Sequence, residues 1–159
     1  MSKLLMSQLA ATNMVYMRFS FDSFLDSMDR LGVHQLELYG CSPHFHFYDS
    51  AKDPVPAMKK KLDGRGFRVI SLMPEENTYA VNIAAPEAGI RNKTVEQYMR
   101  FIEAAAELSC PQMLLCPGRP YRDRPLSEGY RWARDSVERL VRHAEKCGVV
   151  IIYENFKER

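Results

Sequence analysis

Residues 148–154 read Gly148-Val149-Val150-Ile151-Ile152-Tyr153-Glu154. A short, mostly β-branched apolar run of this kind is typical of a strand in a parallel sheet that is buried on both faces. The glycine that precedes the run can end the long helical pattern over residues 127–148. The stretch therefore predicts a strand over residues 149–153 that follows a helix and ends at a carboxylate.

The same alternation extends back to the start of the chain. Further short apolar runs predict strands over residues 4–7, 35–39, 68–72 and 112–116. Apolar residues spaced three and four apart predict a first helix over residues 21–31, between Ser20 as N-cap and Gly32. A second helix is expected from Asp53-Pro54 to Gly64 or Gly66, and a third is expected to begin with a capping box at Thr94-Val95-Glu96-Gln97.

Regular alternation of strands and helices indicates an α/β fold with a parallel sheet and right-handed crossovers. The expected strand-to-helix connections are long, over residues 8–19, 40–53, 73–93 and 117–126, whereas the helix-to-strand connections are short. A βα barrel places long loops of this kind at the carboxyl ends of its strands, where its chemistry lies. A doubly wound sheet shows the same asymmetry, so loop length alone leaves both architectures open.

The chain length limits the barrel interpretation. A (β/α)8 TIM barrel takes ~250 residues, whereas this chain has 159. Five strands and four helices fit either a small open sheet or the N-terminal part of a truncated barrel. We favour the truncated barrel, because an uncovered parallel edge strand promotes aggregation. No linker divides the sequence, so residues 1–159 are expected to form a single incomplete domain.

Composition narrows the class of partner. Lys and Arg number 22 against 20 Asp and Glu, so net charge gives no reason to expect binding to nucleic acid or to an anionic membrane. No apolar run reaches the ~20 residues of a membrane-spanning helix. The four cysteines form no CxxC pair, which argues against a disulfide framework or a zinc knot and favours a reducing, cytoplasmic location.

Glu154 is the strongest candidate for chemistry. A carboxylate at the carboxyl end of a buried strand is costly to desolvate unless a cation or a donor meets it. A hard divalent metal ion or a proton-transfer role suits this position. The alternative is a structural carboxylate paired with an arginine from a neighbouring loop.

Other polar residues follow the expected strand ends. His44 lies after the second strand, where it could bind a hydroxyl-rich ligand or pack on aromatic rings. Arg119 follows the fourth strand and could hold an anionic group or pair with Glu154. The loop after the third strand is polar, aromatic and long. Its polar groups either hydrogen-bond to one another or bind a polyol. In the second case the candidate binding residues are Glu75, Asn77, Tyr79 and Asn82.

At these residues the chain resembles the sugar phosphate isomerase/epimerase superfamily of xylose isomerase-like TIM barrels. Within it, the sequence is most similar to the fructoselysine 3-epimerase and ketose 3-epimerase group. The resemblance covers essentially the whole chain and is carried by 35–40 with Pro43-His44, by Pro74-Glu75 with Asn77, Tyr79 and Asn82, and by Ile152-Tyr153-Glu154-Asn155.

The resemblance implies a (β/α)8 barrel that binds one divalent metal ion, Mn, Co or Zn, with Glu154 as first ligand. It further implies 3-epimerisation of a ketose or ketose derivative through an enediolate, with Glu154 as one member of an acid/base pair. His44 and the Glu75–Asn82 segment would line the sugar pocket. The family's remaining ligands, an Asp, a His and a second Glu, lie on later strands. This chain alone is therefore expected to bind metal weakly and to be inactive.

Two alternatives from the same reasoning remain open. The first is a non-catalytic half barrel or sugar-binding remnant, and the second is an inosose dehydratase or hydroxypyruvate isomerase of the same superfamily. A related DNA-repair endonuclease is disfavoured by the weak net charge and the few histidines. A half barrel would expose apolar edges, so we expect the chain to self-associate as a homo-oligomer.

Overall fold

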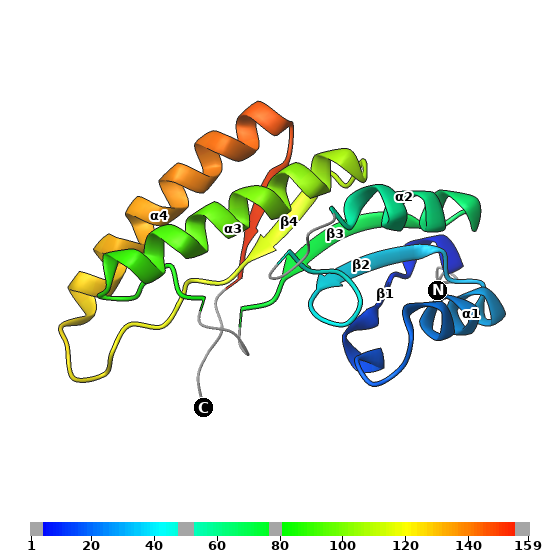
Figure 1. Ribbon diagram of the computed structural model, residues 1–159, viewed down its shortest axis with the longest axis horizontal. Helices are drawn as coiled ribbons and strands as arrows, with labels where there is room; N and C mark the ends of the chain where they lie inside the picture. Colours follow the sequence, from blue (N-terminus) through cyan, green and yellow to red (C-terminus); the bar gives the residue numbers. More distant parts are fainter. Residues whose placement is uncertain (1–4, 48–52, 77–80, 155–159) are drawn as a thin grey trace.

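All the strands in the described part of the chain run parallel in a single sheet, in the order β1-β2-β3-β4-β5 (Figure 1). The computed structural model describes residues 5–47, 53–76 and 81–154. The strands are β1 (Ala11–Thr12), β2 (Gln35–Gly40), β3 (Arg68–Pro74), β4 (Gln112–Leu115) and β5 (Val150–Tyr153). The α-helices are α1 (Phe21–Leu31), α2 (Val55–Gly64), α3 (Ala88–Glu107) and α4 (Leu126–Cys147).

The helices bury their apolar stripes against one face of the sheet. Leu36 and Leu38 of β2 belong to the main core with side chains from all four helices. Tyr39, next in the strand, belongs instead to a smaller cluster with Cys41 and Met73 on the opposite face. Helices α3 and α4 lie side by side (Figure 1). The arrangement is the predicted α/β fold, the first five strands and four helices of a TIM-barrel pattern.

Helix α1 begins and ends where the sequence predicts. The Ser20 side chain accepts a hydrogen bond from the backbone N–H of Ser23 at 3.2 Å, which satisfies one of the free donors of the first turn. Gly32 follows the helix in the left-handed conformation with φ +69°. These two caps fix the length of α1 and direct the chain into β2.

The prediction of a first strand over residues 4–7 is wrong. Met6–Gln8 form a 3-10 helix, η1, and Leu4 lies outside the described residues. The first strand is instead Ala11–Thr12, which pairs with β2 in register with Leu36 and Glu37. A second 3-10 helix, η2 (Asn13–Tyr16), follows at once. The short strand escaped detection because two residues are too few to show an alternating pattern.

The prediction that α3 begins with a capping box at Thr94 is also wrong. The helix begins at Ala88, and Thr94 is buried within it. Its hydroxyl donates to the Ile90 carbonyl at 2.7 Å and accepts from the Asn82 backbone N–H at 2.9 Å. Threonine satisfies its hydroxyl in this way inside helices as well as at their ends. The first two turns carry few apolar residues, so periodicity did not reveal them.

No helix in the three described segments is long and apolar enough to span a membrane.

Candidate active site at the carboxyl ends of the strands

Glu154 directly follows β5, as predicted. Its backbone N–H donates to the Leu115 carbonyl at 3.0 Å, which continues the β4–β5 pairing by one residue. Its side chain is exposed. Burial is the main cause that raises the pKa of Glu37, Glu76 and Cys116, and the negative charge of Glu154 adds to each rise. The charge of Glu154 therefore acts on groups of β2 and of the segments that follow β3 and β4.

Glu75 follows β3 and is fully buried, with 0% of its surface exposed. The Tyr39 hydroxyl donates a hydrogen bond to its carboxylate. Its backbone N–H donates to the Gly40 carbonyl at 3.2 Å. Both contacts come from the end of β2, so Glu75 is held between two neighbouring strands.

Glu76 turns toward β4. Its two carboxylate oxygens lie 2.8 and 3.0 Å from the backbone nitrogen of Cys116, which donates to them. Burial raises the pKa of Glu76 to about 7, and the charges of Glu75 and Glu154 add to this shift, while the hydrogen bonds from Cys116 oppose it. Near neutral pH, Glu76 therefore exists in both protonation states.

Glu37 occupies a mid-strand position in β2 between Leu36 and Leu38. Because neighbouring side chains alternate across a sheet, Glu37 projects on the same face as Tyr39, away from the helices. Burial first, and then the charge of Glu154, raises the pKa of Glu37. The charge of Glu154, which follows β5, therefore acts on the Glu37 carboxyl group of β2.

His44 uses both of its ring nitrogens on protein partners. Nδ1 lies 3.0 Å from Nδ2 of Asn13, and Nε2 lies 2.8 Å from the Phe19 carbonyl oxygen. The imidazole also packs near the Phe21 ring, with centroids 5.4 Å apart. Any contact between His44 and a sugar would therefore use the carbon edge or face of the ring.

Asn82 and Arg119 meet, but through the backbone of Arg119. The Asn82 amide nitrogen donates to the Arg119 carbonyl at 2.7 Å, and its oxygen accepts from the Arg119 and Ala84 backbone N–H groups, both at 2.9 Å. Asn82 thus joins the loop after β3 to the loop after β4. Burial is the main cause that raises the pKa of Cys116, and the positive charge of Arg119 partly opposes this rise at the mouth of the sheet, the edge formed by the carboxyl ends of the strands.

Of the seven predicted site residues, Asn77 and Tyr79 lie outside the described residues. Glu75, Arg119 and Glu154 gather around the ends of β3, β4 and β5, while His44 and Asn82 brace the loops. Sequence reasoning did not single out Glu37, and it included Glu76 only as part of the Glu75–Asn82 segment. The signal for Glu37 was present, because it is a carboxylate at an alternating position within an otherwise apolar strand.

The carboxylates fit part of a metal site. Glu154 offers an exposed oxygen ligand at the end of its strand, and a cation there would relieve the repulsion that Glu37 and Glu76 experience. Among the residues that the structure describes, no three His, Cys, Asp or Glu side chains are grouped so that they could hold a metal ion. Within the described residues, Glu154 could therefore serve as at most one ligand of an incomplete coordination sphere.

The sequence of the chain matches a family model described as the xylose isomerase-like TIM barrel, over residues 25–159. No curated protein has a significant sequence match to the chain. The family match covers every strand from β2 to β5, together with all of the carboxylates around the mouth.

Solved structures share the fold. A D-tagatose 3-epimerase-like protein superposes with a TM-score of 0.78 at 20% identity, over 94% of this chain and 53% of that one. The 3-keto-D-glucoside 4-epimerase from E. coli gives 0.69 at 17% identity, over 91% and 54%. D-Psicose 3-epimerase from Clostridium cellulolyticum H10, solved with D-tagatose, gives 0.67 at 16% identity, over 89% and 50%. The chain spans about half the length of these proteins.

Proposed function

Because the chain belongs to the family of xylose isomerase-like TIM barrels, we propose that it forms the β1–β5 part of the pocket of a sugar isomerase or epimerase. The reaction we propose is the metal-dependent 3-epimerisation of a ketose or ketose derivative, such as a fructoselysine-like sugar. The observation that carries the proposal is the position of Glu154 at the end of β5, where its charge adds to the burial that raises the pKa of Glu37, Glu76 and Cys116. The epimerase names of the structural relatives support the same class of reaction.

Glu154 and Glu75 would have different roles in the proposed epimerisation. The exposed Glu154 carboxylate takes the proton from the carbon beside the substrate carbonyl, because an exposed carboxylate can approach a bound sugar directly. Glu75, buried and hydrogen-bonded to Tyr39, fixes the wall between β2 and β3. A divalent metal ion held in part by Glu154 would supply polarisation of the carbonyl, which makes the neighbouring C–H more acidic.

Titration with Mn²⁺ tests the role of Glu154. By calorimetry on the 159-residue chain, we expect weak binding that falls at least threefold in Glu154→Gln. Glu96→Gln, an exposed position on α3, is the matched control and should bind as the parent chain does. Equal affinity of the parent chain and Glu154→Gln would overturn the assignment of Glu154 as a ligand.

Sugar binding is tested separately with D-tagatose as the probe. In NMR titrations, shift changes should concentrate on backbone amides at the ends of β3, β4 and β5. Changes confined to the helical face would exclude this mouth as the pocket. Epimerisation of D-tagatose by the 159-residue chain with Mn²⁺ would contradict the proposed lack of activity.

A second candidate function is a non-catalytic sugar-binding half barrel. It is favoured by the incomplete coordination sphere in the described part of the chain. An inosose dehydratase or hydroxypyruvate isomerase would use the same carboxylate to remove a proton beside a carbonyl. Turnover assays of a longer protein that contains this chain, with a ketose, an inosose and hydroxypyruvate, separate these reactions.

We also propose a small-molecule sugar as the ligand, a cytoplasmic location, and no nucleic-acid or membrane partner. The near balance of positive and negative side chains and four cysteines that are all free support these assignments.

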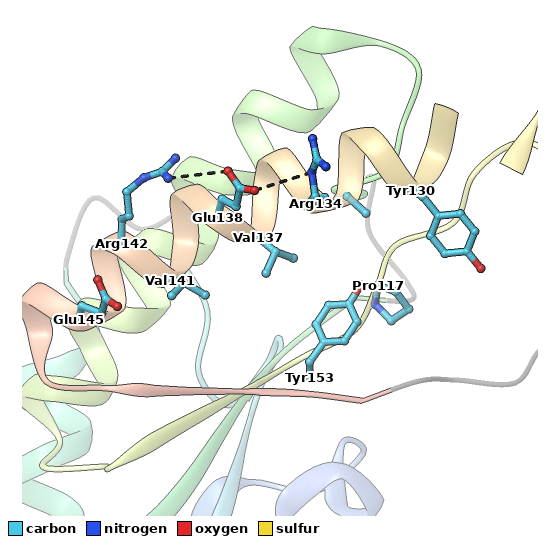
Figure 2. Close-up of a pocket in the computed structure, with 10 residues that line it drawn as sticks. Pro117, Tyr130, Arg134, Val137, Glu138, Val141, Arg142, Glu145 and Tyr153 are labelled. Carbon is cyan, nitrogen blue, oxygen red and sulfur yellow. Dashed lines mark ion pairs between the residues drawn. The ribbon is translucent and has the colours of Figure 1, made fainter. Parts of the chain in front are cut away.

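Self-association of the 159-residue chain is proposed from its exposed apolar edges. Beside β5 lies a groove of about 480 Å³ between α4 and the strand, lined by Tyr130, Val137, Val141 and Tyr153 (Figure 2). Tyr130 is 73% exposed and Tyr153 44%. Around β1, Val15 and Phe19 are similarly exposed. The occupant we propose is a second copy, whose β1 side would bring apolar side chains to this groove.

A further inference from the structure

We propose that Asn13 is a positioning residue of the pocket, which holds His44 as the neutral Nε2–H tautomer and joins it to the end of β2. The proposal deepens the proposed function and rests on it, because it concerns the wall of the same sugar pocket. Asn13 belongs to η2, immediately after β1, and none of the sequence patterns singles it out. It is fully buried, with 0% of its surface exposed.

Every hydrogen-bonding group of the Asn13 carboxamide is engaged. Its oxygen accepts from the Tyr39 backbone N–H at 2.7 Å, and its nitrogen donates to the Tyr39 carbonyl at 3.1 Å. The second hydrogen on that nitrogen points to Nδ1 of His44, at 3.0 Å. A rotated amide would oppose two acceptors at the Tyr39 carbonyl, so the orientation of the carboxamide is fixed by its partners.

The two partners of His44 determine its tautomer. The Asn13 amide nitrogen can only donate, so Nδ1 must be the acceptor and carries no proton. The Phe19 carbonyl can only accept, so Nε2 must carry the proton. Protonation of Nδ1 would remove the bond from Asn13. These two bonds select the Nε2–H tautomer, so the ring presents to a ligand an aromatic surface with no free nitrogen.

The same carboxamide also supports Glu75. Asn13 fixes both backbone groups of Tyr39, and the Tyr39 hydroxyl donates to the buried Glu75 carboxylate. One side chain near β1 therefore orients two residues of the pocket wall, His44 directly and Glu75 through Tyr39. A sugar at this wall would meet an uncharged stacking surface beside a fixed carboxylate.

NMR of the histidine rings tests the assignment without any ligand. In long-range ¹H–¹⁵N spectra of the ¹⁵N-labelled chain at pH 7.5, His44 should show a protonated Nε2 and an unprotonated Nδ1. An Nδ1–H tautomer, or an averaged pattern of both tautomers, would overturn the proposal. This measurement needs no variant, so it decides the question even where substitutions impair folding.

The variant Asn13→Asp changes the pattern in a defined direction. A carboxylate facing Nδ1 can accept but not donate, so Nδ1 of His44 should carry a proton in this variant. Asn92→Asp, at an exposed position of α3 where Asn92 accepts from Arg139, should leave the His44 signals unchanged. A His44 pattern in Asn13→Asp identical to that of the parent chain would contradict the proposal.

The outcomes remain separable from those of the function tests. Failure of D-tagatose to bind would count against the pocket and leave the tautomer result standing. A wrong tautomer with normal D-tagatose shifts at the ends of β3, β4 and β5 would remove the role of Asn13 and retain the pocket.

Discussion

At the scale of single residues, the mouth of the sheet is defined by how its carboxylates are satisfied. Glu75 is buried and accepts from a phenol, Glu76 accepts from a backbone N–H, and Glu154 is exposed. The sequence predicted that Glu154 ends a strand and that Glu75 lies at the same edge. It could not predict their partners, because Tyr39 and Cys116 reach them only through the pairing of strands that are distant in sequence.

The raised pKa of Glu76 predicts a pH-dependent stability. The carboxyl has an ordinary value of 4.5 and about 7 in the folded chain, so between these values the folded state keeps a proton that the unfolded state has lost. The free energy of unfolding should therefore fall as pH rises from 4.5 to 7. In Glu76→Gln that fall should shrink by on the order of 1–3 kcal/mol in urea denaturation at pH 5 and pH 8.

Glu96→Gln, on the exposed side of α3, should reproduce the pH dependence of the parent chain. A Glu76→Gln variant whose stability falls with pH as steeply as that of the parent would show that Glu76 titrates normally.

Tyr39→Phe should destabilise the fold by about 1–3 kcal/mol, because it removes a donor from the fully buried Glu75 carboxylate. Tyr121→Phe is a matched control, since the exposed Tyr121 hydroxyl donates to Glu87 at 3.2 Å in contact with solvent. Its cost should stay below about 0.5 kcal/mol. Equal losses from the two substitutions in urea denaturation would argue against the buried hydrogen bond.

At the scale of elements, periodicity and caps predicted most of the fold. Helix α1 and strands β2–β5 lie within a residue or two of their predicted positions because each has a clear apolar pattern and a stop signal. The start of α3 and the strand β1 were missed. The first turns of α3 are held by Thr94, whose hydroxyl bridges Ile90 and Asn82, and such a tertiary contact leaves no periodic trace in the sequence.

The junction between the loops after β3 and β4 predicts opposite effects at two glycines. Gly118 has φ +78°, and a Cβ there would lie 2.7 Å from the Asn82 side-chain oxygen. Gly118→Ala should therefore destabilise by more than about 1 kcal/mol. Gly89 lies in the first turn of α3 with nothing within 4 Å of the same added atom, so Gly89→Ala should stabilise by up to ~1 kcal/mol. Thermal denaturation compares them directly.

If Gly118→Ala is tolerated as well as Gly89→Ala, the contact between Asn82 and residues 118–119 does not constrain the two loops. The variant Asn82→Ala tests the same contact separately, because it removes the hydrogen bonds to Arg119 and Ala84 while leaving Gly118 in place.

At the scale of the whole molecule, the chain carries five parallel strands of a barrel pattern whose solved relatives are about twice as long. The sequence predicted this partial fold from its length and alternation. The exposed groove beside β5 (Figure 2) and the apolar residues around β1 are the corresponding open edges.

These edges predict concentration-dependent association. Sedimentation of the 159-residue chain at micromolar concentration should show a dimer or larger species, and Tyr130→Lys in the groove should weaken the association at least tenfold. Leu31→Lys, at a position that is 62% exposed at the end of α1, should not weaken it. A single monomer boundary for the parent chain across this range would exclude a second copy as the occupant.

Glu75, Glu76 and Glu154 follow the ends of their strands and Glu37 lies within β2, and these four carboxyl groups have a consequence for any ligand that binds near them. Burial is the main cause that raises the pKa of Glu37 and Glu76, and the negative charge of Glu154 adds to both rises. Among the described residues, the positive charge of Arg119 opposes the raised pKa of Cys116 at this mouth. The complement of this surface is therefore electropositive or rich in hydrogen-bond donors. An anionic ligand placed here would need its own counter-charge to arrive with it.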